Sequence, residues 1–210
     1  MLTDNLWLVD KTSGAGQSVG QIGFDRILGL SCSQNPGKLY AVDSPQNGNS
    51  ILLEVDIQTG LATLIGDIGF DSVTGLALDS QNGILYAITY LDEFLTIDTK
   101  TGQGTLVAHP GSTFLDSLAY DPQQQALFAV NINTGDLYRI DLPGGMGQVV
   151  GATGFSNISG LAYDSTTNTL YGAARASGEL VMLDVNTGVG TRVGSMPNTA
   201  FNALASCPGN

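Results

Sequence analysis

Five polar side chains stand at comparable places along the chain, each one or two residues after a phenylalanine. They are Asp25, Asp71, Asp116, Asn157 and Asn202, after Phe24, Phe70, Phe114, Phe155 and Phe201. Three carboxylates and two amides that converge would suit a hard cation such as Ca²⁺, or a ligand rich in hydroxyl groups. The metal hypothesis rests on Asp25, Asp71 and Asp116. Five solvated turn residues would show the same spacing, so that interpretation stays open.

A second set of polar and aromatic residues would surround the same place. It consists of Tyr90, Asp92, Asn131 and Arg175, with Asp43 and Asn133 in loops of the same kind. These residues differ from one loop to the next, and variable loops on a repeated scaffold usually carry specificity. We therefore expect them to contribute to ligand binding.

Residues for nucleophilic or metal catalysis are scarce. The one histidine, His109, is followed by a proline, which is typical of a loop, and nucleophilic catalysis usually needs a base such as histidine beside the nucleophile. No His and Cys cluster has zinc spacing, and no glycine-rich phosphate loop opens a helix. The sequence predicts no catalytic residue and a protein that is not an enzyme.

The two cysteines, Cys32 and Cys207, fall at similar places in the first and last copies of a repeat. A disulfide between them would close a loop of about 175 residues and stabilise the fold by about 4–5 kcal/mol on a chain-entropy model. Two small buried residues that lie too far apart to bond remain the alternative.

The elements that would position these residues come from a repeat of 42 to 46 residues. Its copies begin with GLSCS at Gly29, GLALD at Gly75, SLAYD at Ser117, GLAYD at Gly160 and ALASC at Ala203. Each copy divides into four short runs that are rich in β-branched and aromatic residues and bounded by turn residues. A period of this length with four strands per copy is the signature of propeller blades.

The order of the runs predicts how the ring closes. Residues 6–10 match a third run, residues 17–20 match a fourth run, and residues 203–207 match a first run. N-terminal third and fourth strands would therefore lie in one blade with a C-terminal first strand. We expect an all-β, five-bladed propeller that forms a single domain over residues 1–210, without helices.

The fifth unit has no second run. The blade could have three strands, residues beyond Asn210 could supply the fourth, or Met1–Asn5 could fill the gap.

Two further features have structural interpretations. Aspartates that end the third runs and precede Thr-Gly, at Asp56, Asp98 and Asp184, are expected to build turns. The five phenylalanines are expected to pack in the seams between blades.

Together the repeats resemble bacterial β-propeller repeats of the LAYD…LY…LYxID…TG…VG kind, distantly similar to NHL and WD40 blades. The resemblance covers the whole chain and implies the fold. It implies no particular activity. Five-bladed glycosidases carry two aspartates and a glutamate at the mouth of the ring, but Glu54 and Glu179 fall in or beside third runs, away from the axis.

Composition narrows the function. Seven Lys and Arg residues face nineteen Asp and Glu residues, a net charge of −12, which repels phosphate backbones and disfavours nucleic-acid binding. No apolar run is long enough for membrane insertion. Low lysine with abundant Gly, Thr and Asn suggests an exported bacterial protein, extracellular or periplasmic and without its leader, although a cytoplasmic location stays open.

The sequence thus predicts a monomeric, non-catalytic binding or scaffold module with a protein, glycan or small polar ligand at the channel mouth and Ca²⁺ as a candidate cofactor. A structural repeat domain of a surface assembly, or a hydrolase or lyase that uses the mouth carboxylates, are the alternatives.

Overall fold

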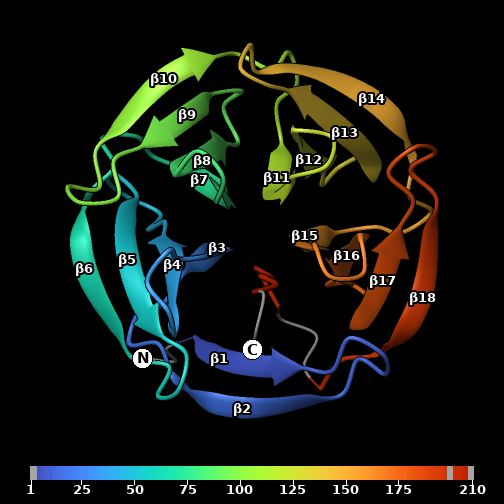
Figure 1. Cartoon of the computed structure of the whole chain (residues 1–210), viewed down its shortest axis with the longest axis horizontal. Helices are drawn as coiled ribbons and strands as arrows, with labels where there is room; N and C mark the ends of the chain where they lie inside the picture. Colours follow the sequence, from blue (N-terminus) through green and yellow to red (C-terminus); the bar gives the residue numbers. More distant parts are fainter. Residues whose placement is uncertain (1–3, 198–200, 208–210) are drawn as a thin grey trace.

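The computed structural model describes residues 4–197 and 201–207. Four four-stranded antiparallel sheets and one two-stranded sheet stand in a ring about a central axis (Figure 1). No helix forms in these ranges, and so none is present there that could cross a membrane. The prediction of an all-β propeller arrangement is confirmed.

The strands follow the predicted order of four per unit. The first complete sheet holds β3 (Ile27–Cys32), β4 (Lys38–Asp43), β5 (Ile51–Asp56) and β6 (Ala62–Asp67). The second holds β7 (Val73–Asp79), β8 (Ile84–Thr89), β9 (Phe94–Ile97) and β10 (Gly104–Ala108). The third holds β11 (Leu115–Asp121), β12 (Ala126–Asn131), β13 (Asp136–Asp141) and β14 (Met146–Ala152). The fourth holds β15 (Ile158–Asp164), β16 (Thr169–Ala174), β17 (Glu179–Leu183) and β18 (Gly190–Ser195). The innermost strands are β3, β7, β11 and β15 (Figure 1).

The aspartates that end the third strands build turns, as the sequence indicated. Asp56 Oδ1 accepts hydrogen bonds from the backbone N–H groups of Gln58 and Thr59, both at 3.0 Å. Gly60 then takes a left-handed φ of 80°, which glycine adopts without a steric cost. Asp184 bonds in the same way to the two residues that follow Val185, at 2.8 and 2.9 Å.

The two-stranded sheet pairs β1 (Asn5–Val9) with β2 (Gly16–Gln21) and has the geometry of the outer half of a complete sheet. Its register shifts between Leu6 and Trp7, just as the β5–β6 register shifts between Leu52 and Leu53. The β13–β14 and β17–β18 pairs shift at the equivalent step. Leu6 therefore corresponds to Leu52, and β1 to a third strand.

Residues 201–207 lie on the axial side of β1 but form no regular strand, which corrects the prediction of a strand at residues 203–207. They nevertheless pack like an innermost strand. A Cβ atom on Gly160 would lie 2.8 Å from the backbone nitrogen of Leu204, and one on Gly75 would lie 2.8 Å from that of Leu118. One of the three explanations for the missing second strand was that Met1–Asn5 fill the gap. Asn5 does not do so, because it pairs in β1, and Met1–Thr3 fall outside the described ranges.

A disulfide joins Cys32, the last residue of β3, to Cys207, with Cα atoms 5.5 Å apart. Of the two alternatives left open for these cysteines, the disulfide is therefore the one that forms. It ties the C-terminal segment to the neighbouring sheet.

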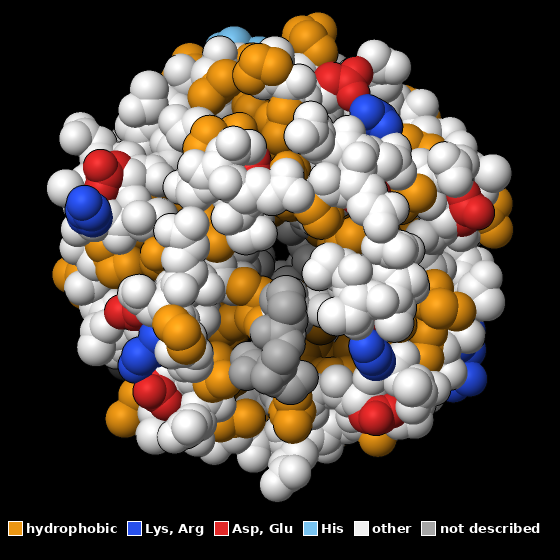
Figure 2. Space-filling model, in the orientation of Figure 1, with side chains coloured by type: hydrophobic (Ala, Val, Ile, Leu, Met, Phe, Trp, Pro, Cys, Tyr) orange, Lys and Arg blue, Asp and Glu red, His pale blue; other side chains and the backbone are white. Residues whose placement is uncertain are grey.

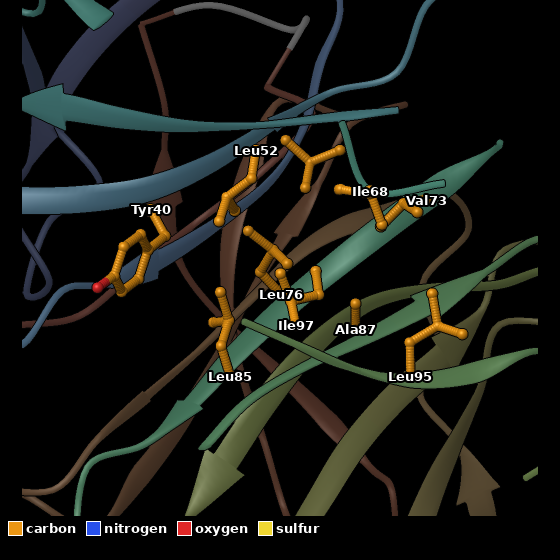
Figure 3. Close-up of a cluster of buried hydrophobic side chains, with 10 residues drawn as sticks. Tyr40, Leu52, Ile68, Val73, Leu76, Leu85, Ala87, Leu95 and Ile97 are labelled. Carbon is orange, nitrogen blue, oxygen red and sulfur yellow. The ribbon is translucent and has the colours of Figure 1, made fainter. Parts of the chain in front are cut away.

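Apolar side chains fill the seams between neighbouring sheets. Figure 3 shows one cluster, in which Leu52 of β5 and Leu76 of β7 lie among side chains from β4, β8 and β9. Leu52, Leu85 and Leu95 are fully buried there. Each seam buries apolar area from both sheets, which is the main force holding the ring together.

The phenylalanine prediction holds at four of five positions. Phe24, Phe70, Phe155 and Phe201 pack against buried clusters. Phe114 does not, because it immediately precedes β11 and is 48% exposed, with a left-handed φ of 63°. The expectation that it plugs a seam is wrong.

Candidate functional site at the channel mouth

The five predicted mouth residues do not occupy equivalent positions. Asp25 and Asp71 are exposed and lie two residues before β3 and β7, whereas Asp116 is the second residue of β11 and is 4% exposed. Asn157 is exposed and directly precedes β15. Alignment on the phenylalanines therefore places Asp116 three positions out of register with Asp25 and Asp71.

Asn202 does correspond to Asp116. The Thr74 hydroxyl of β7 donates to the carbonyl of Leu115 at 3.1 Å, and the Ser159 hydroxyl of β15 donates to the carbonyl of Phe201 at 2.6 Å. Phe201 thus takes the place of Leu115, and Asn202 that of Asp116. The Asn202 side-chain oxygen is buried and has no hydrogen-bond partner among the described residues.

The predicted metal site does not form. Within residues 4–197 and 201–207, no three His, Cys, Asp or Glu side chains come close enough to share a metal ion. Asp25 and Asp71 are exposed in the links before two sheets, whereas Asp116 is buried within β11, so the three carboxylates do not form a cluster.

A buried carboxyl group is the main chemical feature of the mouth. The Tyr90 hydroxyl, just beyond β8, donates to Asp116 Oδ2 at 3.2 Å. Burial raises the pKa of Asp116 to about 7, although the hydrogen bond from Tyr90 and the charge of Arg175 oppose the shift. Burial, and then the nearby Asp116, raises the pKa of Tyr90 well above its usual range. Asp116 is therefore partly protonated near neutral pH and can both donate and accept hydrogen bonds.

Charges from other blades reach the same region. Burial raises the pKa of Asp4, and Asp43 and Asp25 raise it further, whereas the Ile27 amide and Arg175 lower it. The pKa of Asp43 is also raised by burial.

Arg26 belongs to this region as well, because its charge opposes the upward pKa shifts of Asp43 and Tyr90. The sequence predicted neither Asp4 nor Arg26 as part of this region. Asp4 lies outside the repeat, whereas Arg26 directly follows Asp25 and could have been found by its place in the same link.

Two other predicted binding residues hold the loops instead. Asp92 Oδ1 accepts from the backbone N–H groups of Gly111 and Ser112 at 2.8 and 2.9 Å. Asn131 donates to the Thr113 carbonyl at 3.1 Å and accepts from the amide of Asn133 at 3.0 Å. Their side-chain bonds fix the rim near Phe114. His109 is held likewise, with Nδ1 2.7 Å from the carbonyl oxygen of Asp92.

An exposed aromatic side chain stands beside the buried carboxyl group. The ring centroids of Tyr90 and Phe114 are 6.4 Å apart, with their planes tilted by 47°. Viewed along the axis, the molecule is hollowed at its centre, and its charged side chains on this face are few (Figure 2). The mouth therefore combines the aromatic ring of Phe114 with Arg26, Arg175 and several carboxyl groups. Such a set can bind a polar ligand.

Comparison with known proteins supports the fold. No protein-family model matches the chain. No curated protein matches its sequence. Among solved structures, a structural-genomics protein of unknown function from Bacteroides thetaiotaomicron VPI-5482 is 17% identical with a TM-score of 0.68, covering 91% of this chain and 56% of that one.

The structure of a nidogen/laminin complex is 16% identical with a TM-score of 0.67, covering 92% of this chain and 73% of that one. An auxiliary nutrient binding protein from B. thetaiotaomicron VPI-5482 is 12% identical with a TM-score of 0.63, covering 90% and 53%. The chain thus spans little more than half the length of the two Bacteroides proteins.

Proposed function

We propose that the ring is a five-bladed propeller, in which residues 201–207 act as the innermost strand of a blade whose two outer strands are β1 and β2. The supporting observation is a set of leucines that line the other end of the channel. One comes from each complete sheet and one from the C-terminal segment: Leu30, Leu76, Leu118, Leu161 and Leu204. An experimental structure in which residues 203–207 leave the axis would contradict this proposal.

The function we propose is non-catalytic binding of a small polar or hydroxyl-rich ligand, such as a glycan, at the channel mouth. The observation that carries it is Asp116, a buried carboxyl group that Tyr90 holds beside the charge of Arg175. Phe114 would offer an apolar face to a sugar ring. The auxiliary nutrient binding protein among the similar structures is consistent with such a role, although the likeness itself extends only to the fold.

A glycan array followed by calorimetry on the purified chain tests this function. We expect at least one glycan to bind to wild type and to lose most of its affinity in Asp116→Asn and Phe114→Ala. Asp98→Asn, in a turn between β9 and β10 away from the mouth, is the matched control and should bind normally.

Three results would contradict the proposal. They are binding that survives both mouth substitutions, turnover of a bound glycan that Asp116→Asn abolishes, and a defined oligomer that binds no glycan. The second would indicate a carboxylate-based hydrolase or lyase, and the third would indicate a structural repeat domain.

The proposed location is an oxidising compartment, extracellular or periplasmic, because structural disulfides persist there and are rare in a reducing cytosol. The Cys32–Cys207 bond supports it. Thiol titration of the denatured protein, purified without reductant from its native source, should find no free thiol, and two free thiols would contradict the assignment. Light scattering at micromolar concentration should find a monomer.

A further inference from the structure

A cavity with a volume of about 850 Å³ lies between β1 and residues 201–207. We call it the fifth-sheet slot. Its outer wall is β1, its inner wall is the C-terminal segment, and the neighbouring sheets form its sides. Trp7 and Val9 lie on the outer wall, Leu204 and Ala205 on the inner wall, and Leu39 and Tyr171 on the sides.

The edge of β1 that faces the slot offers a row of backbone hydrogen-bonding groups. Asp4 and Asp10 bond through their amides to Phe24 and Ala15, on the β2 side. Because these groups alternate along an antiparallel strand, the N–H and C=O groups of the odd-numbered residues of β1 point to the slot. No strand of the described residues pairs with that edge.

The four complete sheets show what occupies this position elsewhere. There β4, β8, β12 and β16 lie between the innermost and third strands. Their sequences are KLYAVD, ILYAIT, ALFAVN and TLYGAA, so each has leucine, an aromatic residue, and then alanine or glycine. In all four strands this leucine and this aromatic residue are buried, as expected of a strand covered on both faces.

The walls of the slot match that pattern on both faces. Residues opposite each other in a pair point their side chains to the same face, and β4 pairs Leu39 with Val55 and Tyr40 with Glu54. Val9 corresponds to Val55, so an incoming leucine would join the cluster that contains Tyr171 and Val9. The next residue would point to the other side, toward the cluster that contains Leu6 and Leu39.

The charge of Asp10 indicates the direction in which an incoming strand would run. Lys38, the first residue of β4, makes an ion pair of 2.8 Å with Asp56 at the end of β5. Asp10 stands at the equivalent end of β1 and caps its turn as Asp56 does, with Oδ1 accepting from the Thr12 and Ser13 amides. A lysine that begins the incoming strand would therefore lie opposite Asp10 when that strand runs antiparallel to β1.

We propose that the fifth-sheet slot binds an extended segment of another polypeptide, antiparallel to β1, with the pattern Lys-Leu-aromatic-Ala-aliphatic. The segment adds a strand to an open sheet edge, so that backbone hydrogen bonds give affinity and the side pockets give specificity. It would also pair with residues 203–207 and complete a four-stranded sheet. This site is separate from the channel mouth and does not depend on the function proposed there.

The test uses a capped peptide with the sequence of residues 37–44, GKLYAVDS. Trp7 is the only tryptophan of the chain and lines the slot, so its fluorescence reports occupancy directly. We expect a saturable change in emission, a thermal midpoint that rises with peptide concentration, and slower amide exchange at residues 203–207.

Two controls separate strand addition from apolar adsorption. A peptide N-methylated at its alanine lacks the N–H group that would reach β1 opposite Trp7, and it should bind roughly tenfold more weakly. In the protein, Val9→Pro should weaken binding relative to Val9→Ala, because only proline removes the donor that faces the slot.

A peptide that leaves Trp7 emission and the thermal midpoint unchanged up to its solubility limit would overturn the proposal. An N-methylated peptide that binds as tightly as the unmodified peptide would do the same. A dimer found by light scattering that the peptide does not dissociate would mean that a second copy fills the slot, and the proposal would again be wrong.

Discussion

The β3–β6 sheet and the β1–β2 sheet share one pairing pattern but differ in what lies on their axial side. Both shift register at the same step, and both close their outer turn with an aspartate. The β3–β6 sheet continues inward through β4 and β3, whereas β1 faces a cavity of about 850 Å³.

The energetic difference is large. The seam beside β7 buries the ten residues of Figure 3, whereas the seam between β1 and the β15–β18 sheet buries four in the described ranges. An ion pair of 2.5 Å from Lys11 to Asp164, at the end of β15, crosses this seam, and the disulfide from Cys207 to Cys32 ties the C-terminal segment to the sheet on the other side. These two links hold the β1–β2 sheet and residues 201–207 in the ring, whereas the complete sheets have a second strand that joins their inner and outer strands.

Removal of the disulfide should show the largest effect. The Cys32→Ala, Cys207→Ala double variant is expected to lose about 4–5 kcal/mol of unfolding free energy, because the unfolded chain is no longer closed into a long loop. Guanidinium unfolding measures the loss, and amide exchange should speed up first at residues 201–207. If exchange instead rises equally in β3–β6, the two regions do not differ as described.

The axial position that holds Asp116 in a complete sheet and Asn202 in the incomplete one offers a second test. Because the folded pKa of Asp116 is raised to about 7 from an unfolded value of 3.8, the folded state binds a proton more tightly. Its contribution to stability is full below pH 3.8 and is lost as pH rises through 7. Over that window the loss amounts to roughly 4 kcal/mol.

Asp116→Asn should therefore match wild type near pH 4 and exceed it near pH 8 in urea unfolding. Asp4 and Asp43 shift in the same direction, and comparing the variant with wild type at each pH removes their contribution. Parallel stability curves for the two proteins would show that Asp116 is not buried in a charge-sensitive site.

The phenylalanines provide a graded third comparison. Phe70→Ala, in the seam of Figure 3, should cost about 3 kcal/mol of stability through loss of buried area and the cavity left behind. Phe201→Ala should cost less, because its cluster is smaller. Phe114→Ala should stay within about 0.5 kcal/mol of wild type, since its side chain is half exposed. Thermal unfolding ranks the three variants. Equal losses for Phe70→Ala and Phe201→Ala would mean that the two seams are equally well packed.

The lysine ion pairs should show the smallest effects. Lys11→Ala breaks a pair that links two sheets, whereas Lys38→Ala breaks a pair within one sheet. Both midpoints should fall slightly, with the larger fall for Lys11→Ala, whose partner Asp164 is the more buried carboxylate. High salt should shrink the difference. A larger fall for Lys38→Ala would show that the Lys11 pair adds nothing to closure.

The fold was predictable because its units repeat, whereas the mouth was not because it departs from the repeat. Strand order, turn aspartates and the cysteine pair follow from the spacing of copies. Phe114 and Asp116 were misplaced because the link before β11 is offset by two positions relative to the phenylalanines. Aligning on Leu115, the buried first residue of β11, would have put Asp116 in register with Thr74. Asp4 carried no repeat signal at all.

The bond between Cys32 and Cys207 also changes what a protease can do to this molecule. It makes the backbone between those two residues a covalent macrocycle that contains every strand from β4 to β18. A single cut at any loop tip within the macrocycle would leave both fragments attached. The cleaved molecule would keep its mass apart from one added water and would separate into pieces only on reduction.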